Sequence, residues 1–243
     1  MPNAFPLIHP DAVRNGKSHP TTLLVWHDII ASEKERLVWF DTTVAQFEAQ
    51  LEQLDKAGIR PISLTALHAY LTNGIPVPPA HAAILCFDDN TAGIYRHAAP
   101  LLKQRRWPFI VSAHTAYVGV PTSKSHNSYE ELKEMERMEA TVVSQTHTHP
   151  PDLRTLTIAN LRREMSDSKR RLESELGHPV NFLTYPSGKW DARVAAAAQT
   201  AGYVMALTED FGPAESSPHL LGVKRYSTHR RFEEGLASIR RKG

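Results

Sequence analysis

The chain has 243 residues, of which 41% are hydrophobic and 22% charged, a composition that is ordinary for a globular protein. Its formal net charge of +2 is too small to favour a nucleic acid as a partner. The single cysteine excludes an intramolecular disulfide, and no stretch approaches the roughly 18 apolar residues of a membrane-spanning helix.

The chain begins with an extension, residues 1–21, that precedes the first predicted strand. It lacks a basic segment followed by an apolar core, so we expect no signal peptide in it. The location therefore stays open, cytoplasmic for the chain as written, or secreted or periplasmic if a longer precursor is exported. Residues 22–243 are expected to form one domain.

Strand and helix patterns alternate along the rest of the chain. Strands are predicted at 22–26, 60–64, 84–87, 108–112, 141–144, 181–185, 203–207 and 221–226. Helices are predicted at 44–57, 66–73, 95–105, 129–138, 158–176, 192–201 and from 232 onward, the first capped by Asp41 or Thr42 and the second by Thr65. This alternation predicts an α/β fold, a distorted (β/α) barrel of mainly parallel strands covered by helices, in a single domain.

Polar side chains gather where the predicted strands end. The apolar run 84–87 leads directly into Asp88 and Asp89, and burying a carboxylate is costly unless a cation or a proton transfer compensates for it. A second cluster, 145–150, supplies imidazoles. Because the C-terminal ends of barrel strands carry the chemistry in such folds, we expect one site to contain His27, Asp88, Asp89, His147, His149 and Tyr185.

Four segments resemble those of a known family. CFDDN at 86–90 looks like the motif T-F-D-D-G, and THTHPPDLRTLT at 146–157 looks like a histidine pair H-x-x-x-H followed by P-D-L. FLTYPSG at 182–188 and the segment 39–74 match two further blocks. Over about residues 22–230 the chain is thus similar to polysaccharide deacetylases, the NodB-homology carbohydrate esterases. The resemblance implies a distorted (β/α) barrel and metal-dependent removal of N-acetyl groups from amino sugars.

The resemblance also implies roles for individual residues. Asp88 matches the catalytic base, Asp89 the metal-binding aspartate, and His149 the second histidine of the metal-binding pair. One carboxylate must stay free to take a proton from water while its neighbour holds the cation. The expected cation is zinc, with cobalt, nickel or manganese as alternatives.

The substrate is expected to contact the ends of other strands. The segment 185–188 matches the strand end whose backbone N–H holds the oxyanion, and Ser187 is the expected donor. His229 lies near the position of the family's general acid, in a segment that departs from the family pattern. We expect the carbohydrate to contact His27, Tyr185 and Pro186.

The chain departs from the family pattern at the metal site. Gln145 stands where the family has its first metal-binding histidine, and an amide oxygen is a weaker ligand for zinc than an imidazole. Three alternatives stay open: Gln145 is a weak ligand, His147 replaces it, or no metal is held. On an extended segment, position 147 would face the same way as 145 and 149.

Two further departures concern a turn and a cation. Asn90 replaces a glycine, and asparagine is the best tolerated residue other than glycine if that turn needs a positive φ. The arginine that the family places near its third motif is not evident in the sequence.

Two functional hypotheses follow. The first is a hydrolase that removes acetyl groups, as amides or esters, from an amino-sugar polysaccharide or a related carbohydrate. The second is a metal-poor relative that binds carbohydrate or a partner without deacetylating it, as the glutamine at position 145 indicates.

Overall fold

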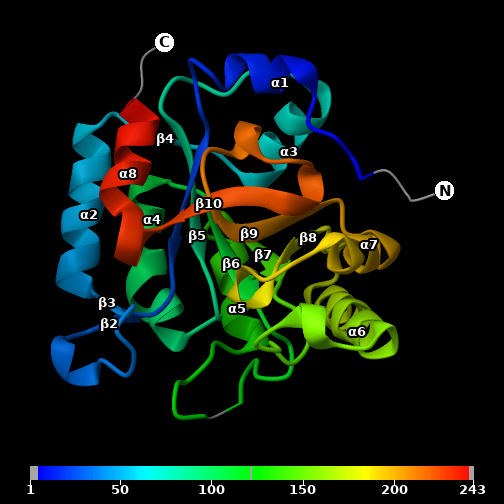
Figure 1. Cartoon of the computed structure of the whole chain (residues 1–243). Helices are drawn as coiled ribbons and strands as arrows, with labels where there is room; N and C mark the ends of the chain where they lie inside the picture. Colours follow the sequence, from blue (N-terminus) through cyan, green and yellow to red (C-terminus); the bar gives the residue numbers. More distant parts are fainter. Residues whose placement is uncertain (1–4, 121, 241–243) are drawn as a thin grey trace.

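Seven parallel strands close into a barrel in the computed structural model, which describes residues 5–120 and 122–240 (Figure 1). The order is β1-β10-β9-β8-β7-β6-β5, and β5 pairs again with β1, while β4 extends the sheet beside β5. A separate parallel pair joins β2 (Ile29–Ile30) to β3 (Thr42–Thr43). The strands of the large sheet are β1 Thr22–Trp26, β4 Arg60–Pro61, β5 Ala82–Phe87, β6 Phe109–Ala113, β7 Ala140–Ser144, β8 Phe182–Thr184, β9 Met205–Phe211 and β10 Val223–Ser227.

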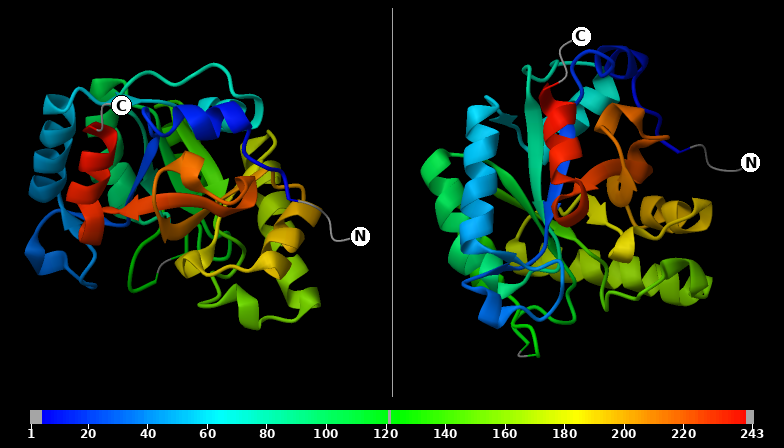
Figure 2. Two further views of the ribbon diagram at one scale, coloured as in Figure 1. Left: turned by 45° about the horizontal axis from the view of Figure 1, so that its top comes forward. Right: turned by 60° about the vertical axis from the view of Figure 1, so that its left-hand side comes forward.

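Helices surround this barrel. The helices α2, α4 and α8 lie on one side, and α6 and α7 lie on the other (Figures 1 and 2). Their bounds are α1 Pro10–Asn15, α2 Val44–Lys56, α3 Leu64–Asn73, α4 Ala99–Arg105 after a π-helical turn Ile94–Ala98, α5 Tyr129–Glu136, α6 Ile158–Leu176, α7 Ala192–Thr200 and α8 Thr228–Arg240. Short 3₁₀ turns occupy Glu33–Glu35, Leu153–Thr155, Pro186–Gly188, Ala214–Ser216 and Leu220–Gly222. The predicted α/β barrel in one domain is confirmed.

Two helix caps differ from the sequence prediction. The N-cap of α2 is Thr43, because its hydroxyl accepts from the Gln46 N–H at 3.2 Å while the Gln46 side chain accepts from the Thr43 N–H at 3.0 Å. Asp41 instead accepts from two N–H groups of the preceding loop. Ser63 caps α3, which shortens the predicted strand 60–64 to two residues. Helix α6 has the predicted bounds.

Alternate residues of the strands belong to two separate apolar clusters. Leu23, Ile84 and Cys86 pack with one cluster, which includes residues of α1 and α3. Their neighbours Leu24 and Leu85 pack with the other, which includes residues of α2, α4 and α8. Both faces of these strands are therefore buried, which explains why they are nearly continuous apolar runs.

The N-terminal segment packs on the barrel. Ala12 of α1 is fully buried, and its carbonyl accepts from the Tyr70 hydroxyl at 3.2 Å. The His9 N–H donates to the Leu71 carbonyl at 2.7 Å, which ties the segment to α3. Within 5–120 and 122–240, no helix combines the length and the apolar character needed to cross a bilayer.

Candidate active site

A cavity of about 210 Å³ opens among the C-terminal ends of the strands. Residues that follow β1, β5 and β7 contribute to its wall, as the strand-end pattern predicts. The wall is formed by His27, Trp39, Phe40, Asp88, Asp89, Gln145, His149, Ser187, Glu209, His229 and Arg230. Three predicted site residues do not line this cavity: His147, Tyr185 and Pro186.

Asp88 is a buried carboxylate held by a buried guanidinium. It is 2% exposed, and Arg225 of β10 is 1% exposed. Arg225 donates to Oδ1 at 3.0 Å and to Oδ2 at 2.8 Å, and the Ser112 hydroxyl donates to Oδ1 at 2.9 Å. Burial lowers the pKa of Arg225, but the Asp88 carboxylate raises it by more, so the guanidinium stays charged. Both Asp88 oxygens therefore accept from a charged guanidinium, and among the described residues Oδ2 has one donor.

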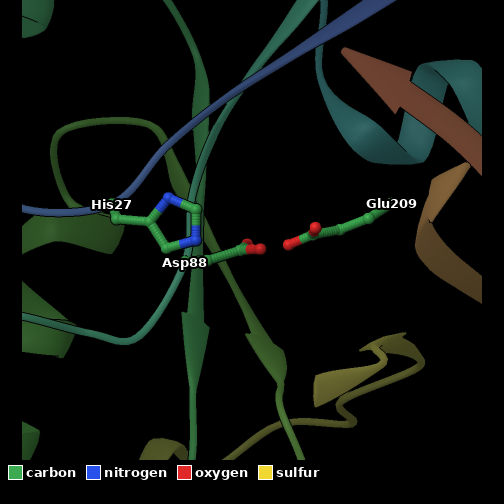
Figure 3. A group of neighbouring side chains, drawn as sticks. All are labelled: His27, Asp88 and Glu209. Atoms are coloured by element: carbon green, nitrogen blue, oxygen red, sulfur yellow. The ribbon is translucent and has the colours of Figure 1, made fainter. Parts of the chain in front are cut away.

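A histidine and a second carboxylate face Asp88 across the cavity (Figure 3). One nitrogen of His27 and one oxygen each of Asp88 and Glu209 lie within 4.8 Å of one another. This spacing could suit a cation. Since Arg225 already engages both oxygens of Asp88, however, a metal here would lie against a guanidinium, and this trio does not fit one. The three groups are better suited to exchanging protons or holding substrate polar groups.

Asp89 and His149 form the part of the predicted metal site that the structure brings together. Asp89 Oδ1 lies 3.5 Å from His149 Nε2. Two ligands of one tetrahedral zinc ion are about 3.3–3.6 Å apart, because each lies about 2.0–2.2 Å from the ion. Burial raises the pKa of Asp89, but His27, His149 and His114 lower it by more, so its net pKa is below the usual value. Carboxylate and imidazole thus suit a divalent cation.

Gln145 does not present a ligand atom to this pair. Its Oε1 accepts from the Asp89 N–H at 2.9 Å, and its Nε2 donates to Asp89 Oδ1 at 3.0 Å and lies 3.3 Å from His149 Nε2. The reverse orientation would place the NH2 group against an N–H and the oxygen against a carboxylate, so the chemistry fixes this one. The Gln145 NH2 group therefore lies between Asp89 and His149 and presents hydrogens rather than a lone pair.

His147 points elsewhere, contrary to the prediction that it faces the same way as Gln145 and His149. Its ring bonds the Thr115 hydroxyl at 2.8 Å and lines a different cavity. The segment is not extended, because Thr146 has φ 66° and His149 has φ 54°. These two left-handed residues break the alternation on which the prediction depended.

The third motif contributes less to the cavity than the sequence predicts. Tyr185 is 1% exposed, and its hydroxyl donates to the Leu221 carbonyl at 3.0 Å, so it packs as a core residue. Pro186 is buried beside it. Only Ser187 reaches the cavity, with φ 53° and ψ 17°.

His229 lines the cavity within an aromatic group. Its ring bonds the Ser227 hydroxyl at 2.8 Å and lies 4.7 Å from the Trp39 ring and 5.7 Å from the His27 ring, between centroids. Burial lowers the pKa of His229 to about 4, with smaller contributions from His27 and Arg230. The ring is therefore neutral at neutral pH, which makes it a poor proton donor.

Backbone strain is concentrated at this site. Eight described residues other than glycine have a positive φ, and five of them border the site. Asn90, which replaces the family glycine, has φ 50°, as the turn requires. Such conformations persist only where the surroundings impose them, and they cluster at functional sites. The five residues are Asp89, Asn90, Thr146, His149 and Ser187.

Several polar residues near the site were missed from the sequence. Arg225 and Glu209 lie on β10 and β9, and His114 follows β6. His114 and His126 line a second cavity of about 300 Å³ that shares Asp89 and His149 with the first. Two features of the sequence could have indicated them. Arg225 is a charged residue inside the predicted strand 221–226, and His114 is a histidine two residues after the predicted strand 108–112.

Burial of His114 predicts that stability depends on pH. Burial, with a smaller effect of His149, lowers the pKa of His114 to about 4, whereas the unfolded chain takes up this proton near pH 6.5. The unfolded state then binds more protons, so the free energy of unfolding falls as pH decreases from 6.5 to 4. For chelator-treated protein we expect this residue to account for roughly 3 kcal/mol of that fall.

Urea unfolding at several pH values between 6.5 and 4 measures this dependence. His114→Asn removes one titrating ring and should make the curve less steep, whereas His19→Asn on the exposed N-terminal segment should leave it unchanged. Parallel curves for the wild type and His114→Asn would contradict the expectation.

Comparison with known proteins agrees with this geometry. The profile of the polysaccharide deacetylase family matches residues 76–206, more than half of the chain. The chain belongs to this family. The match spans all three sequence motifs, and the predicted family is thereby confirmed.

Relatives and solved structures extend the comparison. The protein YxkH of Bacillus subtilis (strain 168) is 24% identical over 213 residues, which cover 88% of this chain and 73% of that protein. The poly-beta-1,6-N-acetyl-D-glucosamine N-deacetylase of Staphylococcus aureus is 28% identical over 160 residues, 63% of this chain and 52% of that enzyme. The chain thus spans about half the length of the staphylococcal relative.

Two solved structures share the fold. The Streptococcus pyogenes deacetylase PplD has a TM-score of 0.78 at 23% identity, covering 86% of this chain and 92% of that one. IcaB from Ammonifex degensii has a TM-score of 0.79 at 22% identity, covering 91% and 97%. This chain therefore has the same barrel fold as these two proteins.

Proposed function

We propose that this protein hydrolyses acetyl groups on an amino-sugar polysaccharide. The observation that carries the proposal is the buried carboxyl group of Asp88, which Arg225 holds at the edge of a cavity at the strand ends. A carboxylate so placed has little structural benefit, since a buried ion pair is weak support for stability. It is well placed to take a proton from water.

Each residue then has a role in amide hydrolysis. Asp88 Oδ2 takes a proton from water as the water oxygen bonds to the acetyl carbon. The backbone N–H of Ser187 stabilises the oxyanion. His27, rather than the predicted His229, passes the proton that Asp88 has taken on to the amine as the carbon–nitrogen bond breaks, because the His27 ring lies within 4.8 Å of Asp88. Acetate and a free amino sugar leave.

A divalent cation belongs to this proposal. Asp89 and His149 would hold it, and zinc suits a carboxylate and an imidazole. When bound, such an ion polarises the acetyl carbonyl and acidifies the attacking water. Gln145 contributes donors rather than a ligand atom, so the third ligand must come from another residue.

An aromatic wall supports a carbohydrate as the substrate. Trp39 is 59% exposed although it lines the cavity, and the Arg230 guanidinium lies 4.8 Å from its ring centroid. An exposed indole held beside a cavity offers a flat apolar face that could pack against a sugar ring. The staphylococcal relative is named for a polymer of N-acetylglucosamine, and we assign this chain the same class of substrate.

Replacing Trp39 tests the role of this wall. In Trp39→Ala we expect KM to rise roughly threefold to tenfold with little change in kcat, because one aromatic contact is worth on the order of 1 kcal/mol. Trp39→Phe should recover part of the loss. Leu37→Ala, at a neighbouring residue that is 61% exposed and outside this cavity, should leave KM unchanged. Steady-state kinetics on an acetylated oligomer measures these values, and an unchanged KM in Trp39→Ala would remove the indole from the substrate site.

The experiment that tests the function is acetate release. The protein is loaded with zinc and incubated with an N-acetylglucosamine oligomer, and acetate and free amine are quantified. Equal amounts of both products support the proposal. Binding of the oligomer without any acetate would instead support the second hypothesis, a relative that binds carbohydrate without deacetylating it, which the amide between Asp89 and His149 favours.

A further inference from the structure

A buried histidine outside the family motifs lies beside the Asp89–His149 pair. His114 is 6% exposed, and its ring centroid is 5.1 Å from that of His149. The cavity of about 300 Å³ that borders both rings also borders Asp89 and His126. Three imidazoles and one carboxylate therefore surround a single space.

The hydrogen bonding of His114 leaves one of its nitrogens free. Its Nε2 lies 3.2 Å from His126 Nε2, so one of these two nitrogens carries the hydrogen and the other accepts it. Its Nδ1 is buried without a partner among residues 5–120 and 122–240. If Nε2 is the donor, Nδ1 has a bare lone pair. Metal-binding histidines have this arrangement, since the nitrogen that does not bind the metal donates to a partner.

His126 is held in place by the turn that contains Asp89. Its neighbour Asn127 donates through Nδ2 to Asn90 Oδ1 at 3.0 Å and to the Thr91 carbonyl at 2.8 Å. The Asn127 N–H donates to the Asn90 carbonyl at 2.9 Å. Asn90 and Asn127 are at most 1% exposed. The asparagine that replaces the family glycine therefore fixes the segment on which His126 lies.

We propose that His114 Nδ1 is the third protein ligand of a divalent cation, together with Asp89 and His149, and that His126 positions the His114 ring. The inference rests on the proposed function and names the residue that replaces the histidine absent at position 145. Two imidazoles and one carboxylate are a common zinc set that leaves a position open for water.

Gln145 then competes with the cation. The proposed ligand atoms of Asp89, His114 and His149 do not all lie within 4.8 Å of one another in the described structure. The Gln145 Nε2 occupies the space between Asp89 and His149. Binding therefore requires the amide to move away and the rings to close on the ion.

Zinc titration of chelator-treated protein, followed by isothermal calorimetry, tests the assignment. In His114→Ala we expect the zinc affinity to fall at least about tenfold, and in His126→Ala by about tenfold, as for residues that orient a ligand. In Gln145→Ala the affinity should stay equal or rise, because the competing amide is removed. His19→Ala, at an exposed histidine, is the control and should bind like the wild type.

Cobalt absorption gives an independent measurement of the ligands. The visible bands of the cobalt-loaded protein should change in His114→Ala and stay unchanged in Gln145→Ala. Circular dichroism confirms that each variant is folded, and His114→Asn replaces His114→Ala if the latter is not.

Several outcomes would overturn the assignment. They are the absence of zinc binding by the wild type, an equal affinity in the folded His114 variant, and a loss in Gln145→Ala as large as that in His114→Ala. The proposed function is tested separately by acetate release. Zinc bound through His114 without acetate release would leave the ligand assignment intact and refute the function.

Discussion

Asp88→Asn should lower kcat for acetate release by roughly two to four orders of magnitude, the usual contribution of a general base. The amide cannot take a proton from water, although its oxygen can still accept from Arg225. Zinc affinity should stay close to the wild-type value, because Asp88 is not among the three proposed ligands. Kinetics with the zinc-loaded variant and calorimetry of the chelator-treated variant measure the two quantities.

The matched control for this variant is Ser112→Ala. Ser112 donates to Asp88 Oδ1 at 2.9 Å and is fully buried, so its loss removes a neutral contact but not the carboxylate. We expect a cost in the free energy of unfolding of about 1 kcal/mol and a kcat within tenfold of the wild type. An undiminished rate in Asp88→Asn would refute the assignment of Asp88 as the base.

The sequence predicts the barrel and the place of its site because both depend on local patterns. Apolar runs separated by amphipathic helices define the parallel strands, and strand ends meet at one face. Asp88, Asp89 and His149 were found because they lie within contiguous motifs that follow strands. The sequence also shows that Asn90 tolerates a positive φ if its turn needs one, and the structure has φ 50° there.

The partners of these residues could not be predicted, because they come from distant strands and loops. Arg225 pairs with Asp88 across 137 positions, and only the closed barrel brings β10 and β5 to the same interior. His126 reaches the site through the bonds between Asn127 and Asn90, which follow no period in the sequence. His147 was misplaced because two left-handed residues redirect its segment.

The error at the third motif has a different physical reason. Tyr185 follows a strand as the other site residues do, but its hydroxyl finds a carbonyl in the core at Leu221. A tyrosine can satisfy its polar group either inside or at a cavity, and the sequence does not distinguish the two. The prediction that it contacts substrate therefore depended on the motif alone.

Arg225→Met should destabilise the protein by about 3–5 kcal/mol, because it leaves the Asp88 carboxylate buried without a counter-ion. The neighbouring Glu209 carboxylate, within 4.8 Å, adds to this cost. In a chain of this size each kcal/mol lowers Tm by about 2–4 °C, so we expect a fall of about 6–20 °C. Deacetylation should be lost as well, because the proposed base, Asp88, loses the group that orients it.

The double variant Asp88→Asn/Arg225→Met separates the structural role of the pair from its catalytic role. Neither charge remains in the double variant. Its free energy of unfolding should therefore be at least about 2 kcal/mol higher than the value obtained by adding the losses of the two single variants. Activity should stay at the level of Asp88→Asn, because restoring stability does not restore a base. Urea unfolding of the wild type and the three variants gives the coupling energy. Strictly additive losses of stability, or a wild-type Tm in Arg225→Met, would show that Arg225 does not hold the Asp88 carboxylate. Recovery of acetate release in the double variant would show that this carboxylate is not the base.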